Sequence, residues 1–158
     1  MLLTLSLLIL MELDQTDKKI VAVLNDNSRL SFREIAQRVG VSVATALNRV
    51  RQLEKDGVIR KYTVLLDYEK IGYEVGVVIN IRVSKGRLLD VEKKIAADPH
   101  VVALYDVTGA FDVIVVAHFK NRRTLDTFLK KIQTFDFVER TETVLILNEM
   151  KSENVGFG

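Results

Sequence analysis

Residues 31–53 read SFREIAQRVGVSVATALNRVRQL, and this stretch decides how the chain is organised. Ser31, followed three residues later by Glu34, is the sequence pattern of a capping box, which begins a helix. Gly40 then favours the end of that helix, because a residue without Cβ adopts the left-handed conformation without steric cost. Ser42 can cap a second helix two residues later. The apolar residues of the first helix recur at the spacing of one buried face: Phe32, Ile35, Ala36 and Val39.

The second helix is predicted to have two different faces. Its inner stripe consists of Val43, Leu47, Val50 and Leu53. Its outward positions are Ala44, Thr45, Asn48, Arg49 and Gln52. A short helix, a glycine turn and a longer helix with a polar outer face are typical of a helix-turn-helix, whose second helix enters the major groove of DNA. The pattern alone leaves an ordinary helical hairpin open as the alternative.

The charge of the chain is unevenly distributed. The 158 residues carry a net charge of only +2. However, residues 28–61 hold eight basic and three acidic side chains, whereas residues 71–158 hold twelve of each. Contacts of Lys and Arg with phosphates supply much of the affinity of proteins for DNA. The local surplus therefore favours double-stranded DNA as a partner over an ordinary solvated surface.

Cysteine and histidine, which supply many metal ligands and catalytic groups, are scarce. The chain has no Cys, so disulfides and thiolate metal sites are excluded, and a reducing, cytoplasmic location is expected. Its two histidines, His100 and His118, offer little for a zinc site or a catalytic triad. We therefore expect no metal, no cofactor and no enzymatic activity.

Residues 1–10 read MLLTLSLLIL and carry no charge. A membrane-spanning helix needs about 20 such residues, and a signal peptide needs a basic start and a cleavage site. We interpret the segment as an N-terminal extension produced by a start codon assigned too early. We expect no association with a membrane.

The first half of the chain predicts a small DNA-binding domain at residues 11–60. A helix is expected from Asp14 to about Leu24, ahead of the helix-turn-helix. Residues 58–67 are rich in β-branched and aromatic side chains, which predicts a strand and makes the domain winged. We assign residues 61–72 to a linker strand and hinge.

The second half predicts a different fold at residues 73–150. Apolar residues alternate strictly from Val75 to Val83, as in a strand with one buried face. The further elements complete the order β-α-β-β-α-β of a ferredoxin-like domain, with strands at 100–107, 111–119 and 138–147 and helices after Gly86 and Asn121. We therefore predict an α+β protein with an N-terminal winged helix-turn-helix, a C-terminal ferredoxin-like domain and a frayed tail at 151–158.

These features together resemble the Lrp/AsnC regulators, the leucine-responsive or feast/famine transcription factors of bacteria and archaea. The resemblance rests on REIAQRVGVS at 33–42, RVRQLEKDGVIRKY at 49–62, and TGAFD at 108–112 in the central hairpin of the second domain. It implies a homodimer built through the C-terminal domains, often assembled into tetramers or octamers. It also implies an amino acid or related metabolite as an effector bound between those domains.

Candidate DNA contacts lie on and around the second helix. Its N-terminal half would face the bases, so the candidates for base contacts are Ser42, Ala44, Thr45, Asn48 and Arg49. Asn can pair with adenine, Arg with guanine, and a Thr methyl group can touch that of thymine. The other candidates, Arg29, Ser31, Arg51 and Lys55, flank the helices, where basic side chains suit phosphate contacts. An exposed helix flank is the alternative for Arg51 and Lys55.

The TGAFD loop is the candidate effector site. A turn at Gly109 exposes backbone N–H groups that can bind a carboxylate, and Asp112 can accept a hydrogen bond from an ammonium group. The resemblance places the family's ligand loop at Thr108, Gly109, Ala110, Phe111 and Asp112, and it extends to the facing strand at Thr141 and Thr143. The alternative is that Gly109 only turns the hairpin and Asp112 caps it. Phe135-Asp136-Phe137 stands where the family usually has a Pro-Gly-Val-like turn, so the ligand's identity is left open.

Our hypothesis is a sequence-specific transcription regulator whose effector shifts the population of assemblies and thereby the spacing of the DNA-binding domains. The nearest alternative is an architectural protein that bends or wraps DNA with little sequence preference. An enzyme, such as an acyl phosphate hydrolase, is a more distant alternative. It is disfavoured because the sequence shows no phosphate-binding glycine loop with an adjacent Arg and no pair of nucleophile and base.

Overall fold

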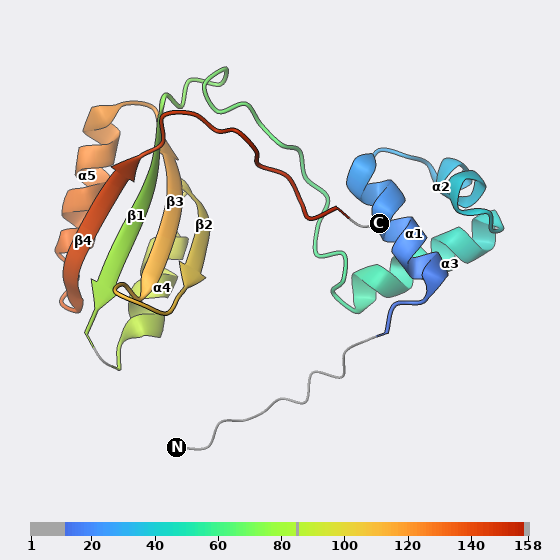
Figure 1. Cartoon of the computed structure of the whole chain (residues 1–158), viewed down its shortest axis with the longest axis horizontal. Coiled ribbons are helices and arrows are strands. Elements are labelled where there is room, and N and C mark those ends of the chain that lie inside the picture. The colour runs from blue at the N-terminus through green and yellow to red at the C-terminus, as the bar shows by residue number, and fades with distance from the viewer. Residues whose placement is uncertain (1–11, 85, 157–158) are drawn as a thin grey trace. The chain divides into compact units, whose positions relative to one another are not determined.

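The computed structural model describes residues 12–84 and 86–156, which form two compact units. The N-terminal unit consists of the described residues up to Leu65 together with those from Glu153 onward. The C-terminal unit is Leu66–Ser152. The chain therefore passes between the units twice, through residues 65–66 and 152–153 (Figure 1). The apolar segment 1–10 lies outside the described residues.

Three helices build the N-terminal unit: α1 (Gln15–Asp26), α2 (Phe32–Val39) and α3 (Val43–Lys55). The predicted capping box of α2 is present, because the Ser31 hydroxyl accepts from the Glu34 N–H and the Glu34 carboxylate accepts from the Ser31 N–H. Asp14 and Asp17 form a second box at the start of α1. The core of the unit is formed by Ile20, Leu24, Ile35, Ala36, Val39, Ala46, Val50 and Leu53.

The turn between α2 and α3 depends on Gly40. Its backbone lies in the left-handed region, at φ 79° and ψ 39°, and its N–H donates to the Ala36 carbonyl. Ser42 then caps α3, because its hydroxyl accepts from the Thr45 N–H at 3.1 Å. The predicted helix-turn-helix is therefore present, with both helices beginning and ending where their sequence signals indicate.

Three residues of the predicted inner stripes, Phe32, Val43 and Leu47, are not in the core. Leu47 is only partly buried. Phe32 and Val43 are each the first residue of their helix, and their side chains are 39% and 48% exposed. Ala46, which was not predicted, is fully buried instead. A residue at the margin of a small core lacks neighbours on one side, so its position in the helical repeat does not ensure burial.

The predicted strand at residues 58–67 is wrong. This segment runs without helix or strand, and the described residues of the N-terminal unit contain three helices and no strand. A strand requires a hydrogen-bonding partner, and no neighbouring segment of the unit supplies one. Tyr62 nevertheless joins the segment to α3, because its hydroxyl donates to the Glu54 carboxylate at 2.9 Å. Burial and this carboxylate raise the pKa of Tyr62 to about 12.

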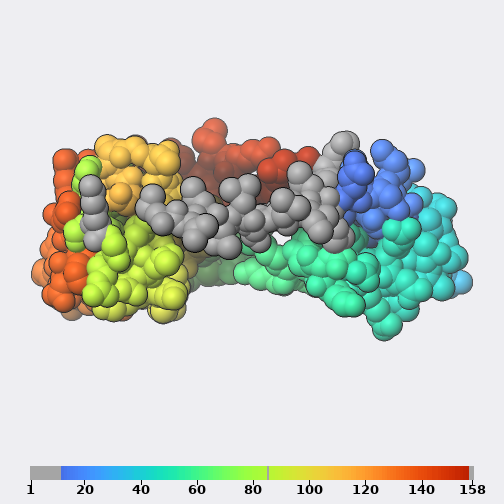
Figure 2. Space-filling view, turned by 90° about the horizontal axis from the view of Figure 1, so that it is seen from below, coloured from blue at the N-terminus to red at the C-terminus, as the bar shows by residue number. Residues whose placement is uncertain are grey.

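The C-terminal unit has the predicted β-α-β-β-α-β order. Its elements are β1 (Val75–Val83), α4 (Leu88–Ala96), β2 (Val101–Asp106), β3 (Val113–Phe119), α5 (Arg122–Gln133) and β4 (Val138–Leu145). The strands form one antiparallel sheet in the order β2-β3-β1-β4. The fold class is therefore α+β, as predicted. Figure 2 shows the yellow-green atoms of α4 on the surface of this unit.

One face of the sheet is covered by helices and the other is open (Figure 1). On the covered face, alternate residues of β1 and β3 are buried against α4 and α5: Val77, Ile79, Ile81, Val83, Val113, Val115, Ala117 and Phe119. The residues between them on β1, Gly76, Val78, Asn80 and Arg82, point to the open face. No helix among the described residues is both long and apolar enough to cross a membrane.

Replacing Gly40 with Ala tests the turn of the helix-turn-helix. A Cβ at this position would meet no atom within 4 Å, so the cost comes only from the left-handed backbone. We expect Gly40→Ala to lower the free energy of unfolding by about 1–2 kcal/mol, measured by urea denaturation. Gly156→Ala, where φ is not left-handed and space is also open, is the matched control. Equal losses in both variants would contradict this account of the turn.

Candidate DNA-binding and effector sites

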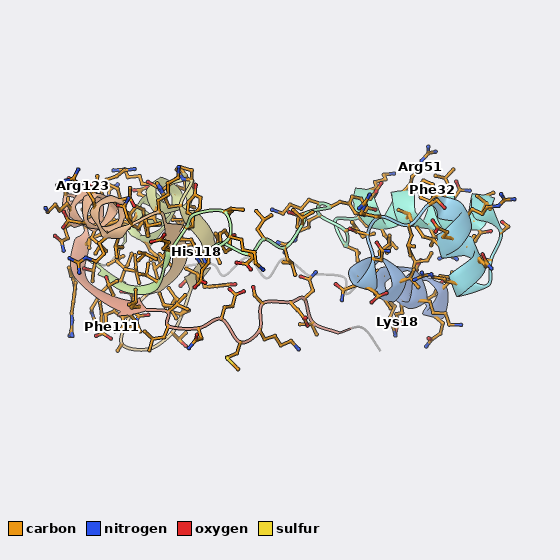
Figure 3. All side chains as sticks on the ribbon, turned by 90° about the horizontal axis from the view of Figure 1, so that it is seen from above. Lys18, Phe32, Arg51, Phe111, His118 and Arg123 are labelled. Atoms are coloured by element: carbon orange, nitrogen blue, oxygen red, sulfur yellow. The ribbon has the colours of Figure 1, made fainter. Side chains whose placement is uncertain are left out.

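The outer face of α3 is a stripe of four exposed residues. Ala44, Asn48, Arg51 and Lys55 recur at i, i+4, i+7 and i+11, so they lie in a row along one side of the helix. The buried residues Ala46, Val50 and Leu53 occupy the opposite side. Figure 3 shows Arg51 pointing away from the helical core. The stripe thus presents one amide and two cations to the surroundings.

Arg49 lies beside this stripe and is engaged within the unit. Its guanidinium lies 2.7 Å from the Asp14 carboxylate and 3.3 Å from that of Asp17, both at the start of α1. The side chain is half-buried, and the pKa of Asp14 is lowered, chiefly by the Asp17 N–H and also by Arg49. Arg49, a predicted base contact, therefore joins α3 to α1 in this structure.

Ser31 and Ser42, two of the residues predicted to contact DNA, use their hydroxyl groups as helix caps. Besides capping α3, the Ser42 hydroxyl lies 2.8 Å from that of Thr45. The Ser31 hydroxyl donates to the Glu34 carboxylate at 2.7 Å. Arg29 is exposed in the loop before α2, where its backbone N–H donates to Asn27. The structure thus brings most predicted DNA contacts to one exposed helix and its flanks.

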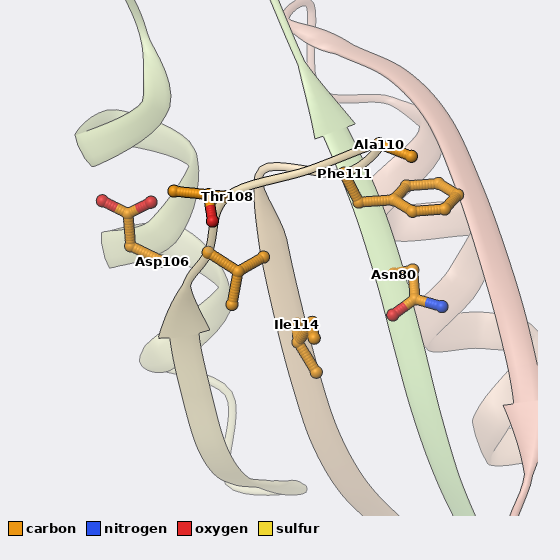
Figure 4. Close-up of a pocket in the computed structure, with 7 residues that line it drawn as sticks. Asn80, Asp106, Thr108, Ala110, Phe111 and Ile114 are labelled. Atoms are coloured by element: carbon orange, nitrogen blue, oxygen red, sulfur yellow. The ribbon is translucent and has the colours of Figure 1, made fainter.

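A hollow of about 760 Å³ lies beside the loop between β2 and β3 (Figure 4). Its lining residues are Asn80, Asp106, Val107, Thr108, Ala110, Phe111 and Ile114. Figure 4 shows Asn80 on β1, Ile114 on β3 and Phe111 converging from the open face of the sheet, while the Asp106 carboxylate points toward α4. The predicted effector residues Thr108, Ala110 and Phe111 are thus brought together with Asn80 and Ile114, which the sequence analysis missed.

The loop itself carries unused donors. Gly109 has φ 129°, and the backbone N–H groups from Thr108 to Phe111 donate no hydrogen bond within residues 12–84 and 86–156. Successive N–H groups in a turn can form an anion-binding concavity. Arg82 and Arg140 stand at the same loop: the first donates to the Ala110 carbonyl at 2.8 Å, and the second lies 5.7 Å from the centre of the Phe111 ring.

Asp112 does not line the hollow, contrary to its predicted contact with an ammonium group. One carboxylate oxygen accepts from the Val83 N–H at 2.8 Å. Its own N–H donates to the Ile81 carbonyl, and its carbonyl accepts from the Val107 N–H. Asp112 therefore fastens the loop to the end of β1, as the capping alternative expected.

Thr141 and Thr143 lie on the opposite face of the sheet from the hollow. They pair with Ile81 and Ile79 of β1, and paired residues of neighbouring strands share a face. That face is the one covered by helices, whereas Asn80 points to the other. The prediction that these threonines line one site together with the loop residues of the same chain is therefore wrong.

Comparisons with known proteins agree with both units. The family model described as "Lrp/AsnC ligand binding domain" matches residues 76–155, and "Winged helix-turn-helix DNA-binding" matches residues 13–60. The chain is 43% identical over 143 residues to an uncharacterized HTH-type transcriptional regulator of Pyrococcus furiosus, covering 90% of this chain and 97% of that protein.

The chain belongs to the Lrp/AsnC family of transcriptional regulators.

Two solved structures of transcriptional regulators and a further sequence relative are similar to this chain. Escherichia coli AsnC matches with a TM-score of 0.82 and 26% identity, over 91% of this chain and 98% of that one. A Neisseria meningitidis transcriptional regulator in complex with L-Met matches with a TM-score of 0.80 and 28% identity, over 89% and 94%. HTH-type transcriptional regulator FL11 of Pyrococcus horikoshii is 34% identical over 139 residues, which cover 88% of this chain and 92% of that protein.

Removing the Asp112 carboxylate tests its structural role in this Lrp/AsnC protein. Asp112→Ala leaves the Val83 N–H without its acceptor, and we expect a loss of about 1–3 kcal/mol in the free energy of unfolding. Asp112→Asn keeps an oxygen acceptor, so its free energy of unfolding should fall by less. Urea denaturation of both variants gives the comparison. An Asp112→Ala protein as stable as the parent would contradict the fastening role.

Proposed function

We propose that this regulator reads a specific DNA sequence through the outer face of α3. The observation that carries the proposal is the exposed row of Asn48, Arg51 and Lys55 opposite the core. Asn48 lies nearer the start of the helix and suits the edge of adenine, while Arg51 and Lys55 suit phosphates. The uneven charge of the chain supports the same surface, because residues 28–61 carry five more positive than negative charges.

We infer that the C-terminal unit pairs two copies through the open face of its sheet. That face carries a continuous apolar row across the four strands, because Val78 pairs with both Val116 and Val144, and Val116 pairs with Ala103. Beside this row, Ile114 pairs with Tyr105. Tyr105 and Val144 are 57% and 49% exposed. A two-fold dimer suits this face, because each copy would cover the other's apolar row. Two DNA-binding units would then read a palindromic site.

The hollow beside the β2–β3 loop is the proposed effector site, and an amino acid is the proposed effector. The free N–H groups of residues 108–111 suit its carboxylate, and the carbonyl oxygen of Asn80 and the hydroxyl of Thr108 suit its ammonium group. Phe111 and Ile114 offer an apolar wall to its side chain. The bound L-Met of the Neisseria regulator supports this class of ligand.

DNA selection tests the reading of sequence. We expect the protein to enrich one palindromic site from a random duplex library. Asn48→Ala should lower the preference for that site over its single-base variants by about 1–3 kcal/mol at the position it reads. Arg51→Ala should weaken binding to all sequences and reduce the slope of log K against log salt by about one.

Arg123→Ala is the matched control for these DNA-binding variants, since Arg123 is an exposed arginine on α5 of the other unit. It should bind as the parent does. A library that shows no enrichment would contradict sequence-specific regulation. It would favour the architectural alternative, in which phosphate contacts and DNA bending supply the binding.

Thermal unfolding with a panel of amino acids tests the effector site. We expect one or a few of them, with L-Met tried first, to raise the unfolding temperature, because a ligand that binds the folded state stabilises it. Asn80→Ala should abolish most of the shift. Thr143→Ala, which alters the opposite face, should keep it. The proposed site would be contradicted if no amino acid raised the unfolding temperature of the parent, or if both variants lost the rise.

A further inference from the structure

A second hollow, of about 480 Å³, lies at the other end of the sheet, where β1 begins and β4 ends. Two chain segments, 66–69 and 146–150, line it together with Glu74, Gly76 of β1 and His118 of β3. All of them belong to the C-terminal unit. Gly76 of β1 pairs with His118 of β3, whereas the effector hollow lies near the other ends of these strands.

His118 is the central feature of this hollow. It is only 8% exposed, and its ring makes no hydrogen bond to any residue of the described ranges. One side of the ring stacks on Tyr68, with centroids 3.9 Å apart and planes 13° from parallel. Figure 3 labels His118 in the C-terminal unit. A buried imidazole that lines a hollow and lacks a partner has donor and acceptor capacity left for a ligand.

Gly76 makes room for this ring. A Cβ at that position would lie 3.2 Å from Cε1 and 3.3 Å from Nδ1 of His118, closer than most side-chain contacts allow. Burial lowers the pKa of His118, and the Glu149 carboxylate opposes this effect in part. The ring is therefore mainly neutral at pH 7, when one of its nitrogens can accept a hydrogen bond.

The rim of the hollow is acidic. Asp67 forms an ion pair with Lys70 at 2.6 Å. The other three carboxylates, Glu69, Glu74 and Glu149, form no ion pair with any part of the chain that the structure describes, and neither Lys nor Arg is among the described residues that line the hollow. Uncompensated negative charge beside low-dielectric walls attracts cations. The described residues contain no group of three carboxylates or histidines close enough to hold a metal ion. These carboxylates are therefore no metal cluster, and the class of cation that we consider for the hollow is an organic one.

We propose that this hollow binds a small organic ammonium ion, with its carbon chain against Tyr68 and His118 and its amine ends at Glu74 and Glu149. The site is separate from the effector hollow and does not depend on the proposed amino acid effector. The chain enters the C-terminal unit at Leu66 and leaves it at Ser152, and both segments line the hollow. A bound cation would therefore hold the first and last segments of this unit against the sheet.

Calorimetric titration of the full-length protein with 1,4-diaminobutane at low salt tests the proposal. We expect saturable binding with one site per chain, and no binding of 1,4-butanediol, which has the same length and no charge. Glu74→Gln and Glu149→Gln should each weaken the affinity about tenfold, the factor expected when a charged hydrogen-bond partner is lost. His118→Phe, which keeps an aromatic ring and removes the nitrogens, should weaken it as well.

Two controls separate this site from general charge effects and from the effector site. Asp136→Asn removes an exposed carboxylate outside both hollows, and Asn80→Ala alters only the effector hollow, so both should bind the diamine as the parent does. Far-ultraviolet circular dichroism checks that each variant is folded. Equal binding of the diol and the diamine, or unchanged affinity in the Glu74→Gln and Glu149→Gln variants, would overturn the proposal.

Discussion

The burial of one face of the sheet against α4 and α5 is the constraint on which the C-terminal unit depends. Alternate residues of β1 and β3 must enter the helix-covered core, so the residues between them are committed to the open face. Asn80 and Gly76 are therefore on the same side as the β2–β3 loop and His118, while Thr141 and Thr143 are not. This two-residue period decides which side chains can meet a ligand together.

The N-terminal unit follows the corresponding rule for a helix. Because α3 must bury Ala46, Val50 and Leu53, its opposite side is fixed as the row that begins at Ala44 and ends at Lys55. Arg49 falls between the two sides and close to α1, where two aspartates hold it. The same helix thus uses one arginine to fix its position and leaves another, Arg51, exposed for a partner.

Much of the fold could be predicted because its signals are local. The caps at Ser31 and Ser42, the turn at Gly40 and the alternation in β1 each depend on residues a few positions apart. The errors concern contacts between distant residues. Whether residues 58–67 pair as a strand, which face Thr141 takes, and what the Asp112 carboxylate binds all depend on tertiary neighbours. Asn80 was missed for the same reason, although a lone amide in an apolar strand could have indicated it.

The open face of the sheet carries three features at once: the apolar row, the effector hollow at one end and the acidic hollow at the other. A second copy docked on this face would adjoin both hollows. Binding of a small molecule would then change the affinity of the two chains for each other, and association of the chains would change the affinity for the small molecule by the same factor. Apparent ligand affinity would vary with the concentration of the protein itself, so the amount of regulator in the cell would help to set the metabolite level to which it responds.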